Sequence, residues 1–138
     1  MQRLIAALCL ALTAACGDTP TSPAPVDAEV TLAPGQRTLV IPASVAITFR
    51  EVADDSRCPI NALCPLPGSA TVRIQIQGPG RTVQDYELRA GGLPLPQPIR
   101  HGDLTIELLS LTPHPFAGHP FDPSEYRATL RVTRSVGS

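Results

Sequence analysis

The chain has 138 residues and a formal net charge of −1, and its 11 basic residues are all arginines spread along the sequence. Without a basic patch, the sequence gives no indication of a nucleic-acid partner or of a surface for anionic lipid. The length allows one domain with a core of its own.

The first fifteen residues have the features of a secretory signal peptide. Arg3 supplies a positive charge, and an apolar run from Leu4 to Leu12 follows it directly. This run is shorter than the roughly 20 apolar residues that a permanent membrane helix requires. A short apolar run behind one positive charge is typical of a signal that is removed after export, so residues 1–15 are predicted to be that signal.

The signal ends in a sequence that resembles the lipobox of bacterial lipoproteins. Leu12-Thr13-Ala14-Ala15 places small residues before Cys16, although Thr13 stands where that family usually has leucine. The resemblance implies that Cys16 is lipidated and becomes the N-terminus of the mature protein. The alternative is an ordinary signal cleavage site with an accidental cysteine behind it.

The residue after Cys16 bears on the location. An aspartate directly behind the lipidated cysteine would resemble the inner-membrane retention signal of enteric bacteria, but here Gly17 precedes Asp18. By this resemblance we expect an outer-membrane lipid anchor that faces the periplasm or the cell surface, with the membrane as a partner. One acyl chain binds a membrane only marginally, whereas the two or three chains of bacterial lipoproteins suit a permanent anchor.

Residues 16–37 are predicted to be the lipidated N-terminus and a flexible tether. The segment from Gly17 to Asp27 contains small polar residues and proline, which cannot bury a core. Proline also keeps such a segment extended. From Glu29 onward the pattern changes to that of a β-strand, and Val30 and Leu32 indicate a short first strand.

Residues 38–134 are predicted to form the folded domain, because apolar and polar residues alternate there as in β-strands. The clearest run covers residues 70–77, and a Gly78-Pro79-Gly80 turn joins it to a return strand over residues 81–89. The other predicted strands cover residues 38–41, 45–50, 104–108 and 126–133.

Short strands separated by proline and glycine turns, with no helical period, predict an all-β fold. We expect an antiparallel β-sandwich with an immunoglobulin-like strand order, and a small closed β-barrel is the alternative. A monomer is expected. Tyr126, at the start of the last strand, resembles a tyrosine corner, in which the hydroxyl bonds to upstream backbone; the alternative is an interior aromatic.

Four cysteines are present, and two of them remain available for a disulfide. Cys9 leaves with the signal peptide and Cys16 is predicted to carry lipid. Cys58 and Cys64 are expected to form a disulfide in an oxidising compartment outside the cytoplasm. A redox-active pair would favour a Cys-x-x-Cys spacing, and a structural zinc site would need four ligands, so both alternatives are weaker.

The cysteine region is similar to that of a group of small bacterial lipoproteins of uncharacterised function. The similarity covers most of residues 45–133 and includes Phe49, Asp55-Ser56-Arg57-Cys58-Pro59, Cys64 and the strand that follows Gly68. The chain departs from the group because it has no tryptophan. The resemblance implies a compact secreted β domain and implies no activity.

Two clusters of charged or metal-ligating residues lie in predicted loops. Arg57 follows two aspartates, Asp54 and Asp55, and we interpret it as a local ion pair that orders the loop rather than as a ligand contact. The residues His114, His119 and Asp122 could hold zinc or copper(II), but no regular spacing aims them at one point, and a solvated loop is the preferred interpretation.

The sequence predicts no enzyme and no cofactor, because no serine or cysteine stands in the setting of an activated nucleophile. We expect a non-enzymatic binding or structural module at the cell envelope. Inhibition of a secreted hydrolase and metal binding are the alternatives. Residues 78–80, 90–99 and 113–123 are the candidate loops for an unknown protein partner, since a sandwich presents loops from a rigid frame.

Overall fold

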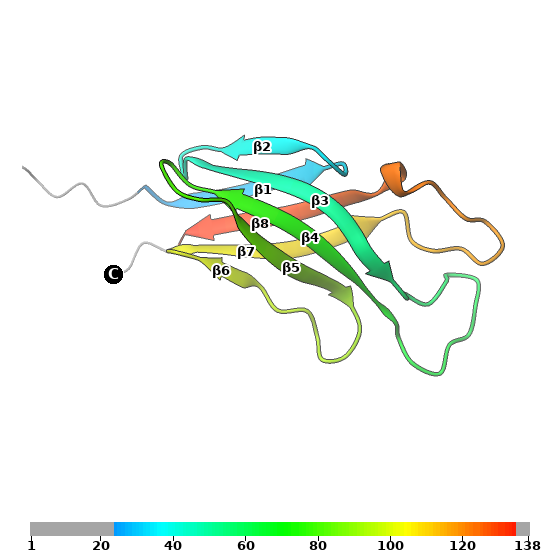
Figure 1. The fold of residues 1–138 in the computed structure, drawn as a ribbon. Coiled ribbons are helices and arrows are strands. Elements are labelled where there is room, and N and C mark those ends of the chain that lie inside the picture. Colours follow the sequence, from blue (N-terminus) through cyan, green and yellow to red (C-terminus); the bar gives the residue numbers. More distant parts are fainter. Residues whose placement is uncertain (1–23, 135–138) are drawn as a thin grey trace, which may run out of the picture.

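The computed structural model describes residues 24–134, so the predicted signal peptide, Cys16 and the first part of the predicted tether, through residue 23, lie outside the described residues. The described chain contains eight strands and one turn of 3-10 helix, and Figure 1 shows how they are arranged. The elements are β1 (Val26–Leu32), β2 (Arg37–Val40), β3 (Val45–Asp55), β4 (Ser69–Gln77), β5 (Gln84–Gly91), β6 (Ile99–His101), β7 (Leu104–Thr112), η1 (Pro123–Glu125) and β8 (Arg127–Arg134).

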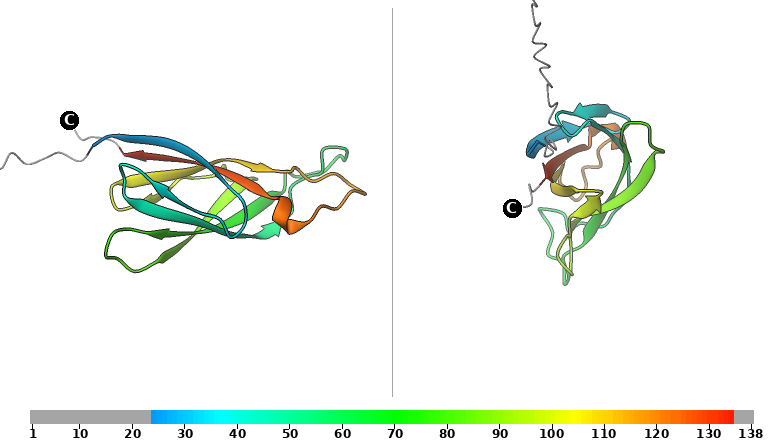
Figure 2. Two further views of the ribbon diagram at one scale, coloured as in Figure 1. Left: turned by 90° about the horizontal axis from the view of Figure 1, so that it is seen from above. Right: turned by 90° about the vertical axis from the view of Figure 1, so that its left-hand side faces the viewer.

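The strands form two antiparallel four-stranded sheets that pack face to face, which confirms the predicted β-sandwich. One sheet has the order β1-β8-β7-β6 and the other has the order β2-β3-β4-β5. The two sheets do not close into a barrel, and Figure 2 shows them as separate layers in the end-on view. The hairpin predicted around residues 78–80 is present as β4 and β5.

The order of the strands differs from the immunoglobulin-like order that we expected. Every pair of hydrogen-bonded strands is consecutive in the sequence, except for β1 and β8. Only the connections from β1 to β2 and from β5 to β6 pass from one sheet to the other. In an immunoglobulin domain the chain passes between its sheets more often, because its connections form a Greek key. Local hairpins therefore account for most of this topology.

The sandwich begins earlier than the predicted boundary at residue 38. Strand β1 pairs with β8 along its whole length, from Val26 opposite Arg134 to Leu32 opposite Ala128. Val26 and Leu32 are both buried. The short first strand predicted at Val30 and Leu32 is therefore present, but the sequence missed its beginning, where the acidic residues Asp27 and Glu29, which are uncommon in strands, separate the apolar positions. The tether prediction is therefore wrong for the residues from Val26 onward.

The core lies between the sheets and consists of the inward half of each alternating strand. Outward residues form exposed ion pairs, such as Arg73 with Glu51 and Glu87 on the β2–β5 sheet, each at 3.0 Å. Such exposed pairs contribute little to stability. The largest fully buried side chains are Phe49, Leu32, Ile47, Ile74, Ile76, Leu88, Leu104, Ile106, Leu130, Val72 and Val132.

The two ends of the sandwich differ. The described chain enters and leaves at one end, near the β4–β5 and β6–β7 turns, and we call this the terminal end (Figure 1). The opposite end carries the three long loops of residues 56–68, 92–98 and 113–122, and we call it the loop end. Among the described residues, no helix has the length and apolar character needed to cross a membrane.

Phe49 provides a test of the core. Replacement of this fully buried ring by alanine (Phe49→Ala) should lower the free energy of unfolding by about 3–5 kcal/mol, because it removes apolar contacts and leaves a cavity. Leu39→Ala, at an exposed leucine on β2, is the control and should change it by no more than about 0.5 kcal/mol. Urea denaturation measures both, and equal effects would contradict the assignment of the core.

Candidate functional site

The loop end is built on a disulfide between Cys58 and Cys64, as the sequence predicted. The two Cα atoms lie 6.0 Å apart, within the ordinary range for a disulfide. The bridge closes a small loop in the connection from β3 to β4. By the chain-entropy relation, a loop of this size contributes about 2 kcal/mol to stability.

Gly68 closes the base of this loop. A Cβ atom at this position would lie only 1.5 Å from the carbonyl oxygen of Ser56, so the backbone can approach this closely only at glycine. Ser56 also donates twice across the gap: its N–H donates to Ser69 O at 2.8 Å, and its hydroxyl donates to the same oxygen at 2.9 Å. The loop therefore leaves and rejoins the sheet at one point.

Arg57 is the only charged or polar residue among residues 24–134 that is buried. Its guanidinium donates to both carboxylate oxygens of Asp55, from Nε to Oδ1 at 2.8 Å and from Nη2 to Oδ2 at 2.6 Å. It also donates to the carbonyl oxygens of Leu111 at 2.7 Å and Pro113 at 2.9 Å. The predicted ion pair is thus present with Asp55. The Arg57 side chain also binds Leu111 and Pro113, which follow it by 54 and 56 positions in the sequence.

Tyr126 completes this cluster from the start of β8. Its hydroxyl donates to Oδ2 of Asp55 at 2.8 Å, and its ring packs edge-on against Phe121 with centroids 5.0 Å apart. A tyrosine corner would bond to backbone instead, so that resemblance is wrong and the interior aromatic is the correct interpretation. Burial and the hydrogen bond to Asp55 raise the pKa of Tyr126 to about 12.

The charges in the cluster are mutually compensated. Burial alone would raise the pKa of Asp55, but hydrogen bonds from the Arg57 guanidinium, the Tyr126 hydroxyl and the Arg57 N–H outweigh it and lower that pKa. The carboxylate therefore stays ionised beside the guanidinium. Removing one partner of a buried ion pair leaves the other charge without compensation, which is strongly destabilising.

A second set of contacts joins the disulfide loop to the loop of residues 113–122. The N–H of Ile60 donates to Pro115 O at 3.0 Å. The side-chain amide of Asn61 bonds twice to Ala117, donating to its oxygen at 3.2 Å and accepting from its N–H at 2.7 Å. The two loops therefore form one unit, although more than fifty residues separate them in the sequence.

The three residues considered as metal ligands have separate partners. His114 directs Nε2 to the carbonyl oxygen of Cys58 at 3.0 Å, and the His119 ring packs against Phe116 with centroids 5.1 Å apart. Asp122 caps the short 3-10 helix by accepting from Ser124 N–H at 2.8 Å. Within the part of the chain that the structure describes, no group of three or more such side chains could hold a metal ion.

Apolar side chains are concentrated on the loop end. Leu63, at the tip of the disulfide loop, is fully exposed, and a cavity of about 470 Å³ lies between this loop and the loop of residues 92–98. Leu109, also exposed, and Leu111 line that cavity from β7. The exposed large apolar side chains of the three loops are Ile60, Leu63, Leu66, Leu93, Leu95 and Phe116.

The sequence predicted part of this site. It placed the disulfide and the Arg57–Asp55 pair correctly, and it named the loops of residues 90–99 and 113–123 as candidates for binding. It missed the hydrogen bond of Tyr126 to Asp55 and the carbonyl partners of Arg57, since both depend on contacts between distant loops. The hydrophobic tip of the disulfide loop was visible in the sequence as Ile60, Leu63 and Leu66.

Comparisons with known proteins found no matching protein-family model, no matching curated protein and no matching solved structure.

The buried ion pair can be tested by its dependence on pH. Arg57→Met should lower the free energy of unfolding at pH 7 by about 3–5 kcal/mol, because Asp55 keeps its charge without a partner. Since the pKa of Asp55 is lowered in the folded protein, its stabilising effect is present above the unfolded value of about 3.9 and is lost as the pH falls through the folded value. The difference between wild type and variant should therefore shrink in acid.

Arg73→Met is the matched control for this experiment. Arg73 also pairs with carboxylates, but its side chain is half exposed, so the loss should stay below about 1 kcal/mol. Urea denaturation at pH 7 and pH 3 measures both variants. A loss for Arg57→Met that equals the control, or that does not change with pH, would contradict the role of the buried pair.

Proposed function

We propose that the protein is a lipid-anchored envelope protein that binds a protein partner with its loop end. The observation that carries the proposal is the concentration of exposed leucine, isoleucine and phenylalanine on three loops that share one end of the sandwich. Single exposed apolar residues are ordinary on protein surfaces, whereas a cluster of them marks an interaction surface.

The stiffness of these loops supports the same proposal. The disulfide, the Arg57 cluster and the Asn61–Ala117 hydrogen bonds hold two of them in one arrangement before any partner binds. Proline restricts the third, which reads Leu93-Pro94-Leu95-Pro96. A surface that is ordered in advance loses less conformational entropy on association, which favours binding.

The position of the loop end, opposite the end at which the chain enters the sandwich, also suits a tethered protein. Ala24 follows the proposed lipidated Cys16 by eight positions, so Ala24, just before the sandwich begins, lies within about 29 Å of the proposed membrane anchor. The chain then enters at the terminal end. Strand β3 has 11 residues and runs for about 36 Å toward the loop end. The apolar loops would therefore face away from the anchoring membrane.

Inhibition of a secreted hydrolase is a special case of this function, because stiff loops at one end of a sandwich could enter the cleft of an enzyme. A module that acts only through its place in the envelope is the other alternative, and it would require no apolar loop end. No contact among the described residues favours metal binding.

The anchor is tested by Cys16→Ser. The variant should lose incorporation of labelled palmitate and move almost entirely from the membrane fraction to the aqueous fraction, because the sulfur atom that carries lipid is gone. Cys9→Ser is the control, since Cys9 lies within the predicted signal peptide, and it should keep both properties. Palmitate label that persists in Cys16→Ser would contradict lipidation at this position.

The partner surface is tested with a photo-crosslinking amino acid placed at Leu63 in living cells. A discrete crosslinked product is expected there, and Leu66→Asp in the same chain should abolish it by putting a charge into the apolar surface. Leu39, an exposed leucine on the β2–β5 sheet, is the matched control and should give no product. Equal products at both positions, or none at Leu63, would contradict the proposal.

A further inference from the structure

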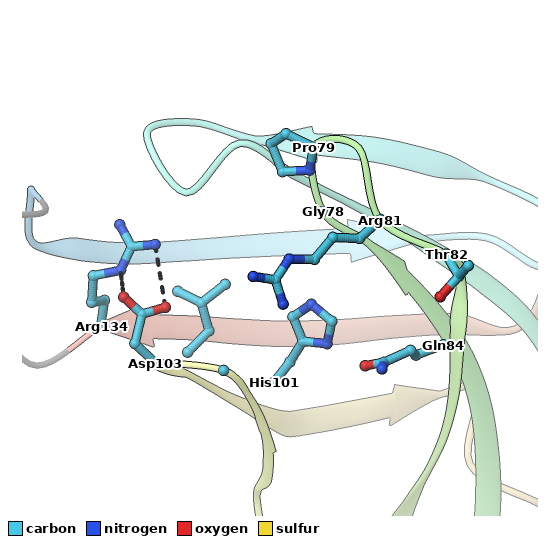
Figure 3. Close-up of a pocket in the computed structure, with 10 residues that line it drawn as sticks. Gly78, Pro79, Arg81, Thr82, Gln84, His101, Asp103 and Arg134 are labelled. Atoms are coloured by element: carbon cyan, nitrogen blue, oxygen red, sulfur yellow. Dashed lines mark hydrogen bonds and ion pairs between the residues drawn. The ribbon is translucent and has the colours of Figure 1, made fainter.

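The terminal end holds a second cavity, of about 750 Å³, with a polar lining. It lies between the β4–β5 turn of residues 78–83 and the β6–β7 turn of residues 101–104, with Arg134 of β8 at its side (Figure 3). No part of the loop end contributes to it. The function proposed for the loop end therefore makes no use of this cavity.

The lining carries more positive than negative charge. Arg134 pairs with Asp103, with 2.6 Å between Nε and Oδ2, so these two charges compensate each other. Arg81 has no such partner: its guanidinium makes no hydrogen bond and no ion pair with any of residues 24–134. Figure 3 shows the Arg81 side chain extending toward the cavity that His101 also lines. One arginine charge is therefore free to attract an anion.

Hydrogen bonds of the Tyr86 hydroxyl fix the ring of His101, which also lines the cavity. The Tyr86 hydroxyl donates its one proton to Gln84 Oε1 at 2.8 Å, so the 2.9 Å contact with His101 requires Nδ1 of the ring to donate to the Tyr86 oxygen. Nε2 of His101 makes no hydrogen bond with any of residues 24–134, and the ring lines the cavity. The Thr82 hydroxyl and the Gln84 side-chain amide add neutral donors to the lining.

The cavity also lies where the chain enters the sandwich. Nη1 of Arg134 donates to the carbonyl oxygen of Ala24 at 3.3 Å. Since Ala24 lies within about 29 Å of an anchor at Cys16, the cavity is on the side of the protein nearest to the membrane surface. Phosphate groups of lipids are the anions that occur at that surface.

We propose that this cavity binds a phosphate group, with Arg81 as its principal ligand. A planar guanidinium donates two parallel hydrogen bonds to phosphate, and the further donors on the lining suit an anion with oxygen atoms on several sides. The phosphate can belong to the headgroup of a glycerophospholipid or to free phosphate. The lipid source rests on the proposed anchor at Cys16, whereas the binding of phosphate does not.

The experiment is a titration of the full protein in a non-ionic detergent, monitored by the backbone amide signals of Gly78 and of residues 80–84 and 101–103. One arm adds inorganic phosphate and the other adds dihexanoylphosphatidylglycerol. Saturable shifts confined to these residues are expected in at least one arm. Tighter binding of the lipid identifies a headgroup as the ligand, and tighter binding of inorganic phosphate identifies the free anion.

Arg81→Gln should weaken the binding about tenfold or more, because it removes a charged hydrogen-bond donor from the site. Arg50→Gln is the matched control: Arg50 is also exposed and makes no side-chain hydrogen bond within residues 24–134, but it lies on the outer face of β3. It should leave the affinity unchanged.

Absence of saturable shifts in both arms, or equal affinity of wild type and Arg81→Gln, overturns the proposal. Arg81 has no contact that the fold depends on, so unchanged thermal unfolding of the variant shows that a loss of binding is not a loss of folding. Neither outcome alters the palmitate and crosslinking results, which test the anchor and the loop end separately.

Discussion

The arrangement of the loop end depends on the buried ion pair of Arg57 with Asp55. This guanidinium reaches both oxygens of a carboxylate on its own loop and two carbonyl oxygens at the end of β7, and Tyr126 adds a third donor to the same carboxylate. Buried charges are tolerated only when such hydrogen bonds are complete. Because every guanidinium nitrogen of Arg57 has at least one acceptor in place, the cluster permits one arrangement of the loops and disfavours others.

The disulfide and the ion pair stabilise the loops in different ways. The bridge between Cys58 and Cys64 shortens the chain that can move, whereas Arg57 fixes where that short loop lies relative to β7 and β8. The remaining order comes from contacts between the loops, such as those of Asn61 with Ala117. Apolar side chains can therefore stay exposed at the tips, because the base of each loop is held by polar contacts rather than by burial of those side chains.

The up-and-down order of the strands separates two kinds of surface. Short turns and both ends of the described chain lie together at the terminal end, while the long connections lie at the other end (Figure 2). The terminal end carries the cavity lined by Arg81 and His101, and most of the exposed large apolar side chains of the described residues lie on the loop end. A tethered protein with this polarity could contact the membrane surface on one side and a protein on the other, without overlap between the two sites.

The sequence by itself determined most of the strands, though not β6 or the start of β1, and it determined the all-β class, the disulfide and the local Arg57–Asp55 pair. Each of these follows from alternation or from residues close together in the chain. The tertiary structure decided the strand order, the start of the sandwich at Val26, the meeting of Asp55 with Tyr126, and the placement of Arg81 and His101 around one cavity. Partners so far apart in the chain leave no periodic signal, since their contact depends on how two sheets and their loops pack.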